Sequence, residues 1–179
     1  MENILIIQMC RMGDLVQTLP LLKRLKEEKE GCEITLLCIR ESVGLVQRSP
    51  LIDCFISVPQ RFYDESRIRI EEDPLLVSSL WKFPALRPHY DRVINLTHDL
   101  SSGILCESVS GKVKFGRAQR VKDEIRALGD WAKYLFAVVT NRTQNLFNLV
   151  DIHVGMGGIV HKPVENWLPV NHGAIEKGG

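Results

Sequence analysis

Short apolar runs alternate with amphipathic segments along most of this chain, and the alternation predicts its secondary structure. The first run predicts a strand at Ile4–Gln8, and its unbroken apolar stretch is typical of burial on both faces of a sheet. Leucines then recur at helical spacing from Leu15 to Leu25. Pro20 lies inside that pattern, so the helix either kinks there or begins there with Thr18 as its N-cap.

Further apolar runs predict four more strands. They are Glu33–Ile39, Cys54–Val58, Asp91–Leu96 and the shorter Lys112–Phe115. Helices are predicted among them at Glu41–Arg48, Leu75–Trp81 and Ser101–Ser110. Strands that alternate with helices imply right-handed βαβ crossovers and a mostly parallel sheet. We therefore expect an α/β fold.

Three stretches depart from this alternation. Gln60–Asp73 mixes arginines and acids with little apolar periodicity, which predicts an exposed, mobile loop. The last third shows only helical spacing, which predicts two helices and no further strand. Their apolar positions are Ile125, Leu128, Ala132, Leu135 and Val139, then Leu146, Leu149, Val150, Val154 and Gly157. From Ile159 onward the pattern dissolves into Pro, Asn and Gly, so we place one domain at 1–160 and the start of an interdomain linker at 161–179.

Composition and charge narrow the class of protein. The chain has 179 residues, of which 45% are hydrophobic and 25% charged, enough for one full core. The 23 Lys and Arg nearly balance the 22 Asp and Glu, so net charge gives no reason to expect a nucleic-acid partner. Five cysteines without metal-ligand spacing indicate free, buried thiols in a reducing compartment. No apolar run reaches membrane-spanning length, and together these features favour a cytoplasmic protein.

The most informative motif is Gly13-Asp14, on the loop after the first predicted strand. Open α/β sheets bind ligands at the carboxyl ends of their strands. A carboxylate that faces such a cleft is a candidate general base. Asp is also a strong N-cap, worth about 1 kcal/mol, so the residues alone leave a catalytic and a structural role open.

The opening segment, ILIIQMCRMGDLVQTLPLLKRLKEE, resembles the start of glycosyltransferase family 9, the heptosyltransferases of lipopolysaccharide core assembly. Glu33–Val58 resembles the second strand and helix of that family and the entry to its third strand. YDRVINLTH, from Tyr90 to His98, and VKFGR, from Val113 to Arg117, resemble its fourth and fifth strands. The ordered set covers most of residues 1–170 and is far more specific than any one piece.

The resemblance implies a Rossmann-like three-layer domain that is the N-terminal, acceptor-side half of a GT-B glycosyltransferase. A second domain would hold most of the donor, which is an ADP-sugar in this family, and no metal or other cofactor is obligatory. The transfer is inverting, and the acceptor is an anionic, lipid-linked saccharide. Because that acceptor is anchored in lipid, a peripheral contact with the inner membrane is expected.

The resemblance also implies roles for individual residues. Asp14 would take the proton of the acceptor hydroxyl, while Gly13 and Arg11 would lie near the donor diphosphate. The alternatives are an ordinary turn glycine at position 13 and an exposed loop arginine without a partner at position 11. Two basic groups after strand ends would receive the anionic acceptor, because guanidinium groups match phosphate oxygens. These groups are Arg61, Arg67 and Arg69, and Arg117, Arg120 and Lys122. Local salt bridges to acids such as Glu65 are the alternative role for the first group, and His98 would either bind the acceptor or cap its own loop.

Other polar residues have structural interpretations. Asp99 is expected to cap the helix that follows it. His153 falls on an apolar stripe and is expected to be a core histidine with satisfied hydrogen bonds. Gly155–Gly158 follows a helix rather than a strand, so it is expected to end that helix rather than bind phosphate.

Two other functional classes compete with the transferase. The main alternative is a stand-alone Rossmann-like binding or interaction module without catalysis. An enzyme that binds NAD is disfavoured because no GxGxxG sequence follows the first predicted strand.

Overall fold

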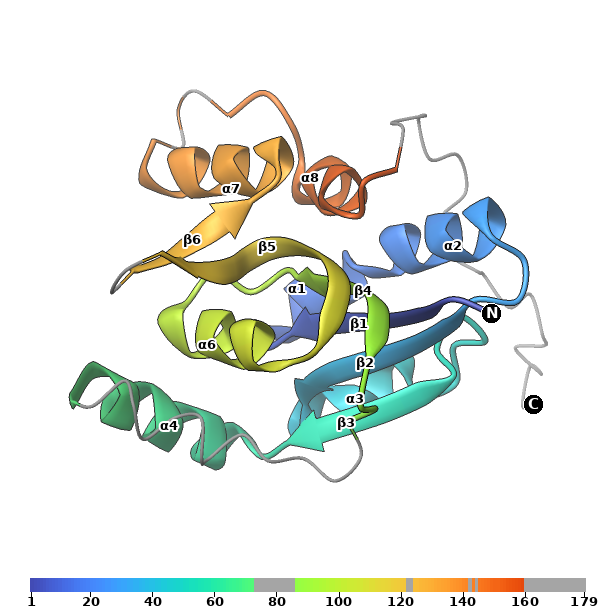
Figure 1. The fold of residues 1–179 in the computed structure, drawn as a ribbon, viewed down its shortest axis with the longest axis horizontal. Helices are drawn as coiled ribbons and strands as arrows, with labels where there is room; N and C mark the ends of the chain where they lie inside the picture. The colour runs from blue at the N-terminus through green and yellow to red at the C-terminus, as the bar shows by residue number, and fades with distance from the viewer. Residues whose placement is uncertain (73–85, 122–123, 142, 144, 160–179) are drawn as a thin grey trace, which may run out of the picture.

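The computed structural model describes residues 1–72, 86–121, 124–141, 143 and 145–159 (Figure 1). The strands in these ranges form one six-stranded sheet in the order β3-β2-β1-β4-β5-β6. Their bounds are β1 Asn3–Gln8, β2 Glu33–Ile39, β3 Cys54–Val58, β4 Tyr90–Asn95, β5 Gly111–Val121 and β6 Glu124–Leu128. Strands β1 to β5 are parallel and β6 is antiparallel to β5. The expected α/β fold with a mostly parallel sheet is confirmed.

The strand order reverses beside β1, which pairs with β2 on one side and β4 on the other. The residues Ile4–Ile7 of β1 are almost completely buried, as an unbroken apolar strand at the centre of a sheet should be. This is the strand order of a Rossmann-like sheet, which opens a crevice at the carboxyl ends of the two strands that flank the reversal. The crevice therefore lies beyond Gln8 and Asn95, the last residues of β1 and β4.

Helices cover both faces of the sheet and make a three-layer molecule (Figure 1). Their bounds are α1 Met12–Val16, α2 Leu19–Glu28, the 3-10 turn η1 Arg40–Ser42, α3 Val43–Val46, α4 Gln60–Glu72, α6 Leu100–Ser108, α7 Asp130–Thr140 and α8 Leu149–Met156. One apolar core joins the sheet to α1, α2, α3, α7 and α8. A second core, on the other face, joins it to α4 and α6.

The leucine-rich segment after β1 forms two helices rather than one kinked helix. Helix α2 begins at Leu19 with Thr18 at the N-cap position and Pro20 in its first turn. Proline is tolerated there because the first turn has no intrahelical partner for its missing N–H. The Thr18 hydroxyl donates to the backbone oxygen of Asp14 at 2.9 Å, so it links α1 to α2 instead of capping α2.

The prediction of a mobile loop at residues 60–73 is wrong, because residues 60–72 form helix α4. Charged and polar side chains stabilise it through i,i+4 pairs, Gln60 with Asp64 at 2.9 Å and Arg61 with Glu65 at 2.8 Å. Tyr63 is buried against the second core and fixes the helix to the domain. The composition that favoured a loop is that of a solvated helix with a narrow buried stripe.

The prediction that residues 125–128 begin a helix is also wrong. They belong to β6, and α7 begins only after Gly129, whose φ of +89° turns the chain out of the strand. Ala127 packs on one core and Leu128 on the other, which is the two-sided alternation of a strand. The fifth strand is correspondingly longer than predicted, since residues beyond Phe115 pair with β6.

Some sequence predictions fall outside the described residues. These are the helix at 75–81 and the linker at 161–179. All five cysteines are free thiols, as predicted, with Cys32, Cys38 and Cys106 buried and Cys10 and Cys54 partly buried. In the described ranges no helix is both long and apolar enough to cross a bilayer.

Candidate functional site

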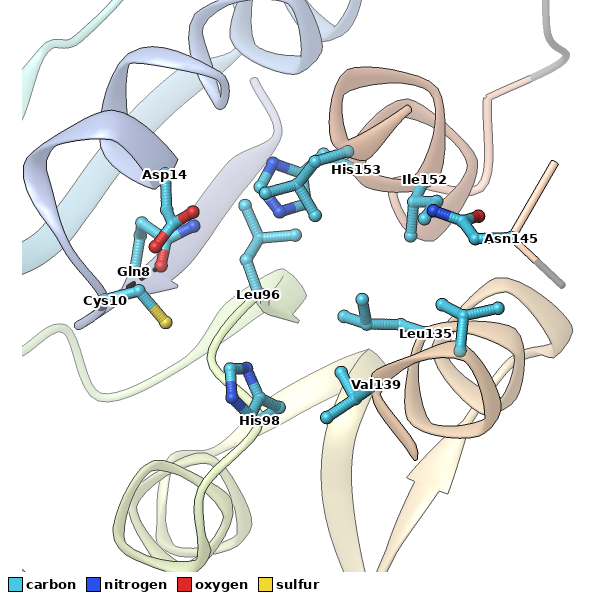
Figure 2. Close-up of a pocket in the computed structure, with 12 residues that line it drawn as sticks. Gln8, Cys10, Asp14, Leu96, His98, Leu135, Val139, Asn145, Ile152 and His153 are labelled. Atoms are coloured by element: carbon cyan, nitrogen blue, oxygen red, sulfur yellow. Dashed lines mark hydrogen bonds between the residues drawn. The ribbon is translucent and has the colours of Figure 1, made fainter. Parts of the chain in front are cut away.

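A cavity of about 310 Å³ opens at the carboxyl ends of β1 and β4, with α7 and α8 along one side (Figure 2). Part of its polar lining comes from the end of β1 and from the segments that follow β1 and β4, and most of its apolar wall comes from α7 and α8. The lining residues are Gln8, Cys10, Asp14, Leu96, His98, Leu135, Val138, Val139, Asn145, Leu149, Ile152 and His153. The cavity thus occupies the crevice at which sheets of this order bind ligands.

Asp14 lines this cavity from the first turn of α1. Its Oδ2 accepts a hydrogen bond from the backbone N–H of Arg11 at 3.2 Å, so the carboxylate also helps to cap the helix. Figure 2 shows it beside Gln8 on one side of the cavity. The structural role of Asp14 is therefore compatible with a catalytic one, because the cap orients a carboxylate that still faces the cavity.

Gln8 anchors the floor of the site. It is buried, its Nε2 donates to the Thr18 hydroxyl at 3.2 Å and its Oε1 accepts from the Cys10 N–H at 3.2 Å. These bonds tie the end of β1 to the loop and to the start of α2. Sequence reasoning did not select Gln8, although a polar residue at the end of an apolar strand is the signal that points to it.

Cys10 lies next to Asp14 in the cavity but is not an activated nucleophile. Burial raises the pKa of its thiol to about 12, and the nearby charges of Asp14 and Asp99 add to the increase. A thiol with that pKa stays protonated at neutral pH. Cys10 therefore contributes shape rather than reactivity.

His98 lines the other side of the cavity, and Arg117 contacts its backbone from β5. The Arg117 Nη1 donates to the backbone oxygen of His98 at 3.0 Å, and its guanidinium carbon stands 5.5 Å from the ring centre of Phe136. Burial lowers the pKa of Arg117, while the charge of Asp99 opposes that decrease. Its Nε is buried without a hydrogen-bond partner among the described residues. Arg117 is thus a half-buried cation that binds the backbone of His98, and His98 is an exposed residue that lines the cavity.

Asp99 caps α6, as predicted, by accepting from the Ser102 N–H at 2.8 Å. It also accepts a hydrogen bond from the hydroxyl of Tyr63 on α4. Burial, followed by the charge of Asp99, raises the pKa of Tyr63, so the phenol keeps its proton and remains the donor. Through this bond α4 is held to the loop that carries His98.

Among the described residues, the other predicted ones, Arg117 included, are not part of the cavity lining. Arg61 and Arg67 are exposed on α4, and Arg61 forms the salt bridge with Glu65 that was its alternative role. Gly13 is part of α1 with open space around it and no positive φ, so it does not need to be glycine for conformational reasons. Arg11 is exposed at the N-cap of the same helix. The side chains of Arg69 and Arg120, and Lys122 as a whole, lie outside the described residues.

The expectation of a satisfied core histidine at position 153 is only half correct. His153 is 1% exposed, and one ring nitrogen makes a hydrogen bond to the backbone of Gln17. Its Nδ1, however, has no hydrogen-bond partner among the described residues, and the residue lines the cavity. Burial lowers the pKa of His153 to about 4. The apolar helical stripe identified burial but not the cavity, because the cavity forms only when α7 and α8 pack on one face of the sheet and bring side chains to the strand ends.

The described residues do not gather three or more His, Cys, Asp or Glu side chains in a metal-binding arrangement. The glycines at the end of α8 terminate the helix, as predicted, with Gly157 at the C-cap and Gly158 at a φ of +73°. The polar chemistry of the site thus rests on a carboxylate, two amides, two imidazoles and a neighbouring guanidinium.

Comparisons with known proteins agree with this fold. Heptosyltransferase WaaC of E. coli, solved with ADP, matches 87% of this chain at 18% sequence identity with a TM-score of 0.56. WaaC solved with ADP-2-deoxy-2-fluoro heptose matches the same share at 16% identity and the same TM-score. The chain has a glycosyltransferase fold. A glycosyl transferase family 9 structure from Veillonella parvula also matches 87% of the chain, at 15% identity and a TM-score of 0.56.

The match covers only part of each glycosyltransferase. This chain spans 46% of the WaaC chain and 40% of the Veillonella parvula chain. No protein-family model matches the sequence, and no curated protein matches it. The resemblance seen in the sequence motifs therefore extends to the fold over less than half the length of these transferases.

Proposed function

We propose that this chain is the acceptor-side half of an inverting glycosyltransferase of the heptosyltransferase type, with Asp14 as its general base. One observation carries the proposal. In a fold shared with glycosyltransferases, Asp14 faces the cavity at the carboxyl ends of the two central strands. A carboxylate at that position can reach a ligand bound in the crevice.

Asp14 would act on the hydroxyl group of the acceptor. A sugar hydroxyl is a weak nucleophile, so its proton must be removed as the new bond forms. The acceptor oxygen would bond to the anomeric carbon while the bond from that carbon to the nucleotide diphosphate breaks, with inversion. The backbone N–H of Arg11 donates to Oδ2 of Asp14, and this bond orients the carboxylate. The other oxygen, Oδ1, would accept the proton of the acceptor hydroxyl.

The donor in this proposal is a nucleotide sugar, as ADP-sugars are for the family that the sequence resembles. The WaaC structures hold ADP and an ADP-sugar analogue, which supports an adenine nucleotide in the same role here. Arg11 and Gly13 would approach the diphosphate from the loop after β1, and most other donor contacts would come from a second domain. The reaction as proposed requires no metal.

The acceptor would be an anionic, lipid-linked saccharide, which brings the protein to the cytoplasmic surface of the inner membrane. Arg117, whose guanidinium binds the backbone of the lining residue His98, is the basic group that we expect to meet its charge. Arg61 and Arg67 lie on an exposed helix and would meet more distant phosphates. Arg69, Arg120 and Lys122 are further candidates for the same role.

The test is Asp14→Asn in the protein at its full natural length, assayed for transfer from a panel of ADP- and other nucleotide sugars. We expect the turnover number to fall by about 10²–10⁴-fold with donor affinity nearly unchanged, because only proton removal is lost. Asp130→Asn is the matched control: Asp130 also lies in the first turn of a helix, but it is exposed and does not line the cavity. Near-normal turnover of Asp14→Asn would disprove the proposal, and acceptor binding without any transfer would favour a non-catalytic module.

A further inference from the structure

The carboxylate of Asp99 lies near the guanidinium of Arg117 but does not pair with it. Arg117 donates from Nη1 to the backbone oxygen of His98, the residue directly before Asp99, at 3.0 Å. Burial lowers the pKa of Arg117 and the charge of Asp99 opposes that decrease, so the two side chains interact through space. Within the part of the chain that the structure describes, however, no hydrogen bond or ion pair joins them.

Two neutral donors occupy the Asp99 carboxylate instead. The Ser102 N–H donates to Oδ1 at 2.8 Å and so caps α6. The Tyr63 hydroxyl donates to Oδ2 from α4, which covers the same face of the sheet as α6. Tyr63 is 3% exposed and packs in the core on that face, so its hydroxyl approaches Asp99 from a fixed position. Both oxygens of Asp99 therefore have a donor without the guanidinium.

Arg117 retains a nitrogen that can bind an anion. Its Nη1 is used by the His98 carbonyl, and its guanidinium carbon stands 5.5 Å from the ring centre of Phe136. Its Nη2 has no hydrogen-bond or ion-pair partner among the described residues, and Nε is the one unpaired nitrogen of this side chain that is buried. Nη2 is therefore accessible to solvent. An accessible guanidinium nitrogen without a paired acid suits the oxygens of a phosphate or carboxylate group.

Resting on the proposed function, in which Arg117 meets the charge of the acceptor, we propose that Tyr63 is a positioning residue that holds Asp99 away from Arg117 and keeps this guanidinium available to an anionic group. Without the Tyr63 hydroxyl, Oδ2 of Asp99 would lose its donor and would turn to the neighbouring cation. Asp99 would then compete with the anion for Arg117. Tyr63 is not part of the cavity lining, so it acts through Asp99 and not by contact with a substrate.

Three substitutions separate this role from a structural one. Tyr63→Phe keeps the buried ring and removes the hydroxyl. Asp99→Asn removes the charge, and asparagine caps a helix as well as aspartate does, so α6 keeps its N-cap. Ser66→Ala removes another buried hydroxyl of α4, one that bonds the backbone oxygen of Tyr63 at 2.7 Å. A structural effect of the Tyr63 hydroxyl would be reproduced by Ser66→Ala and would not depend on the charge at position 99.

The direct experiment titrates the chain with inorganic phosphate and follows the Nε–Hε resonance of Arg117 by NMR, assigned with Arg117→Gln. Sodium chloride at equal ionic strength is the comparison. We expect phosphate to shift this resonance more than chloride does. The apparent Kd for phosphate should rise roughly twofold to fivefold in Tyr63→Phe, the range expected when a partly exposed ion pair competes, and stay at the wild-type value in Ser66→Ala.

The charge of Asp99 gives the decisive comparison. In an Asp99→Asn background, Tyr63→Phe should cause no further change in the Kd for phosphate, because the competing carboxylate is gone. An equal loss of affinity with and without that charge would refute the proposal. It is also wrong if phosphate and chloride shift the Arg117 resonance alike, or if Tyr63→Phe binds phosphate as tightly as the wild type. The comparison of Tyr63→Phe with Ser66→Ala tests it even if Asp99→Asn does not fold.

These results can be told apart from a failure of the proposed function. Unchanged turnover of Asp14→Asn together with a phosphate affinity that depends on Tyr63 would reject the general base and retain the positioning role. Lost turnover in Asp14→Asn with an unaltered phosphate affinity in Tyr63→Phe would do the opposite. In the full-length protein, Tyr63→Phe should raise the KM for the acceptor more than it lowers kcat, and Asp99→Asn should suppress that increase.

Discussion

Buried polar side chains hold the ends of the two central strands in place. Asn95 is fully buried, and its Nδ2 donates to the Arg117 carbonyl at 2.9 Å and to the Ser102 hydroxyl at 3.2 Å. Its Oδ1 accepts from the Thr97 N–H at 3.0 Å, and the Thr97 hydroxyl accepts from the Met9 N–H at 2.7 Å. Satisfied networks of this kind make a site rigid, because each buried group would be costly to leave unpaired. These hydrogen bonds therefore hold the first residues of the loops after β1 and β4 in a defined position.

His153 should make folding sensitive to acid. Its pKa falls from 6.5 to about 4 on folding, so between these values the unfolded chain binds a proton that the folded chain does not. Stability then rises with pH across this window and is lost as the pH falls from about 6.5 to about 4, by roughly 3 kcal/mol in total. Urea unfolding at several pH values should show this loss in the wild type.

The control for that prediction is His153→Gln, which keeps a polar side chain near Gln17 but cannot be protonated. Its stability should depend less on pH between about 4 and 6.5 than that of the wild type. Equal slopes for the two proteins would show that His153 is not the group responsible.

At the scale of elements, the junction of β4 and β5 depends on one glycine. Gly116 has a φ of +90°, and a Cβ there would lie against the backbone carbonyl of Asn95, with the carbonyl carbon 2.8 Å away. Moving the Asn95 backbone away would disrupt the hydrogen bonds between β4 and β5, which are parallel neighbours within the sheet. Gly116→Ala should therefore lower the free energy of unfolding by roughly 3 kcal/mol or more, measured by urea denaturation.

Gly44→Ala is the matched control for this substitution. Gly44 lies in the short helix α3 and is exposed, and a Cβ added there would meet no other atom within 4 Å. Replacing glycine by alanine in a helix is expected to be neutral or to stabilise by up to about 1 kcal/mol. If both variants lost similar stability, the argument from the contact at Asn95 would fail.

Helix α4 is held to the domain partly by the hydrogen bond between Tyr63 and Asp99. Tyr63→Phe keeps the buried ring but removes the hydroxyl, which should cost about 1–2 kcal/mol because Asp99 loses a donor. Loosening α4 should also speed tryptic cleavage after Arg61 and Arg67, which are exposed on it. Limited proteolysis with mass spectrometry measures this.

Tyr134→Phe gives the comparison, since the Tyr134 hydroxyl bonds to Asn145 and Leu146 in the α7–α8 connection instead. That variant should leave cleavage in α4 unchanged. Faster cleavage in both variants would indicate a general loss of stability rather than local release of α4.

At the scale of the whole molecule, the cavity does not suit a nucleotide diphosphate. None of the described residues that line it is Lys or Arg, and Asp14 adds a negative charge. Diphosphates are bound by cationic side chains and by clusters of backbone N–H groups. We therefore expect the 179-residue chain to show no binding of ADP by isothermal titration calorimetry, since under the proposed function ADP is bound mainly by a second domain. Tight ADP binding by this chain would contradict the division of donor and acceptor between two domains.

Much of the fold could be predicted from local sequence. The apolar run at Ile4–Ile7 and the runs at residues 33–39 and 54–58 predict their strands closely, because burial on both faces leaves a continuous hydrophobic signal. The prediction failed at α4 and β6. In α4 the stabilising pairs are between charged or polar residues, and in β6 the side chains of Ala127 and Leu128 pack on different cores. A one-dimensional pattern does not report either kind of contact.

The sequence likewise predicted only part of the candidate site. By itself the sequence determined that Asp14 and His98 follow strands whose carboxyl ends meet at one edge, because parallel pairing follows from the alternation of strands and helices. Only the tertiary structure decided which other groups join them. His153 lies far beyond His98 along the chain, and it reaches the cavity because α8 packs beside α2 and α7 on one face of the sheet. Helical periodicity identifies a buried face, but the neighbours of that face are set by packing between distant elements.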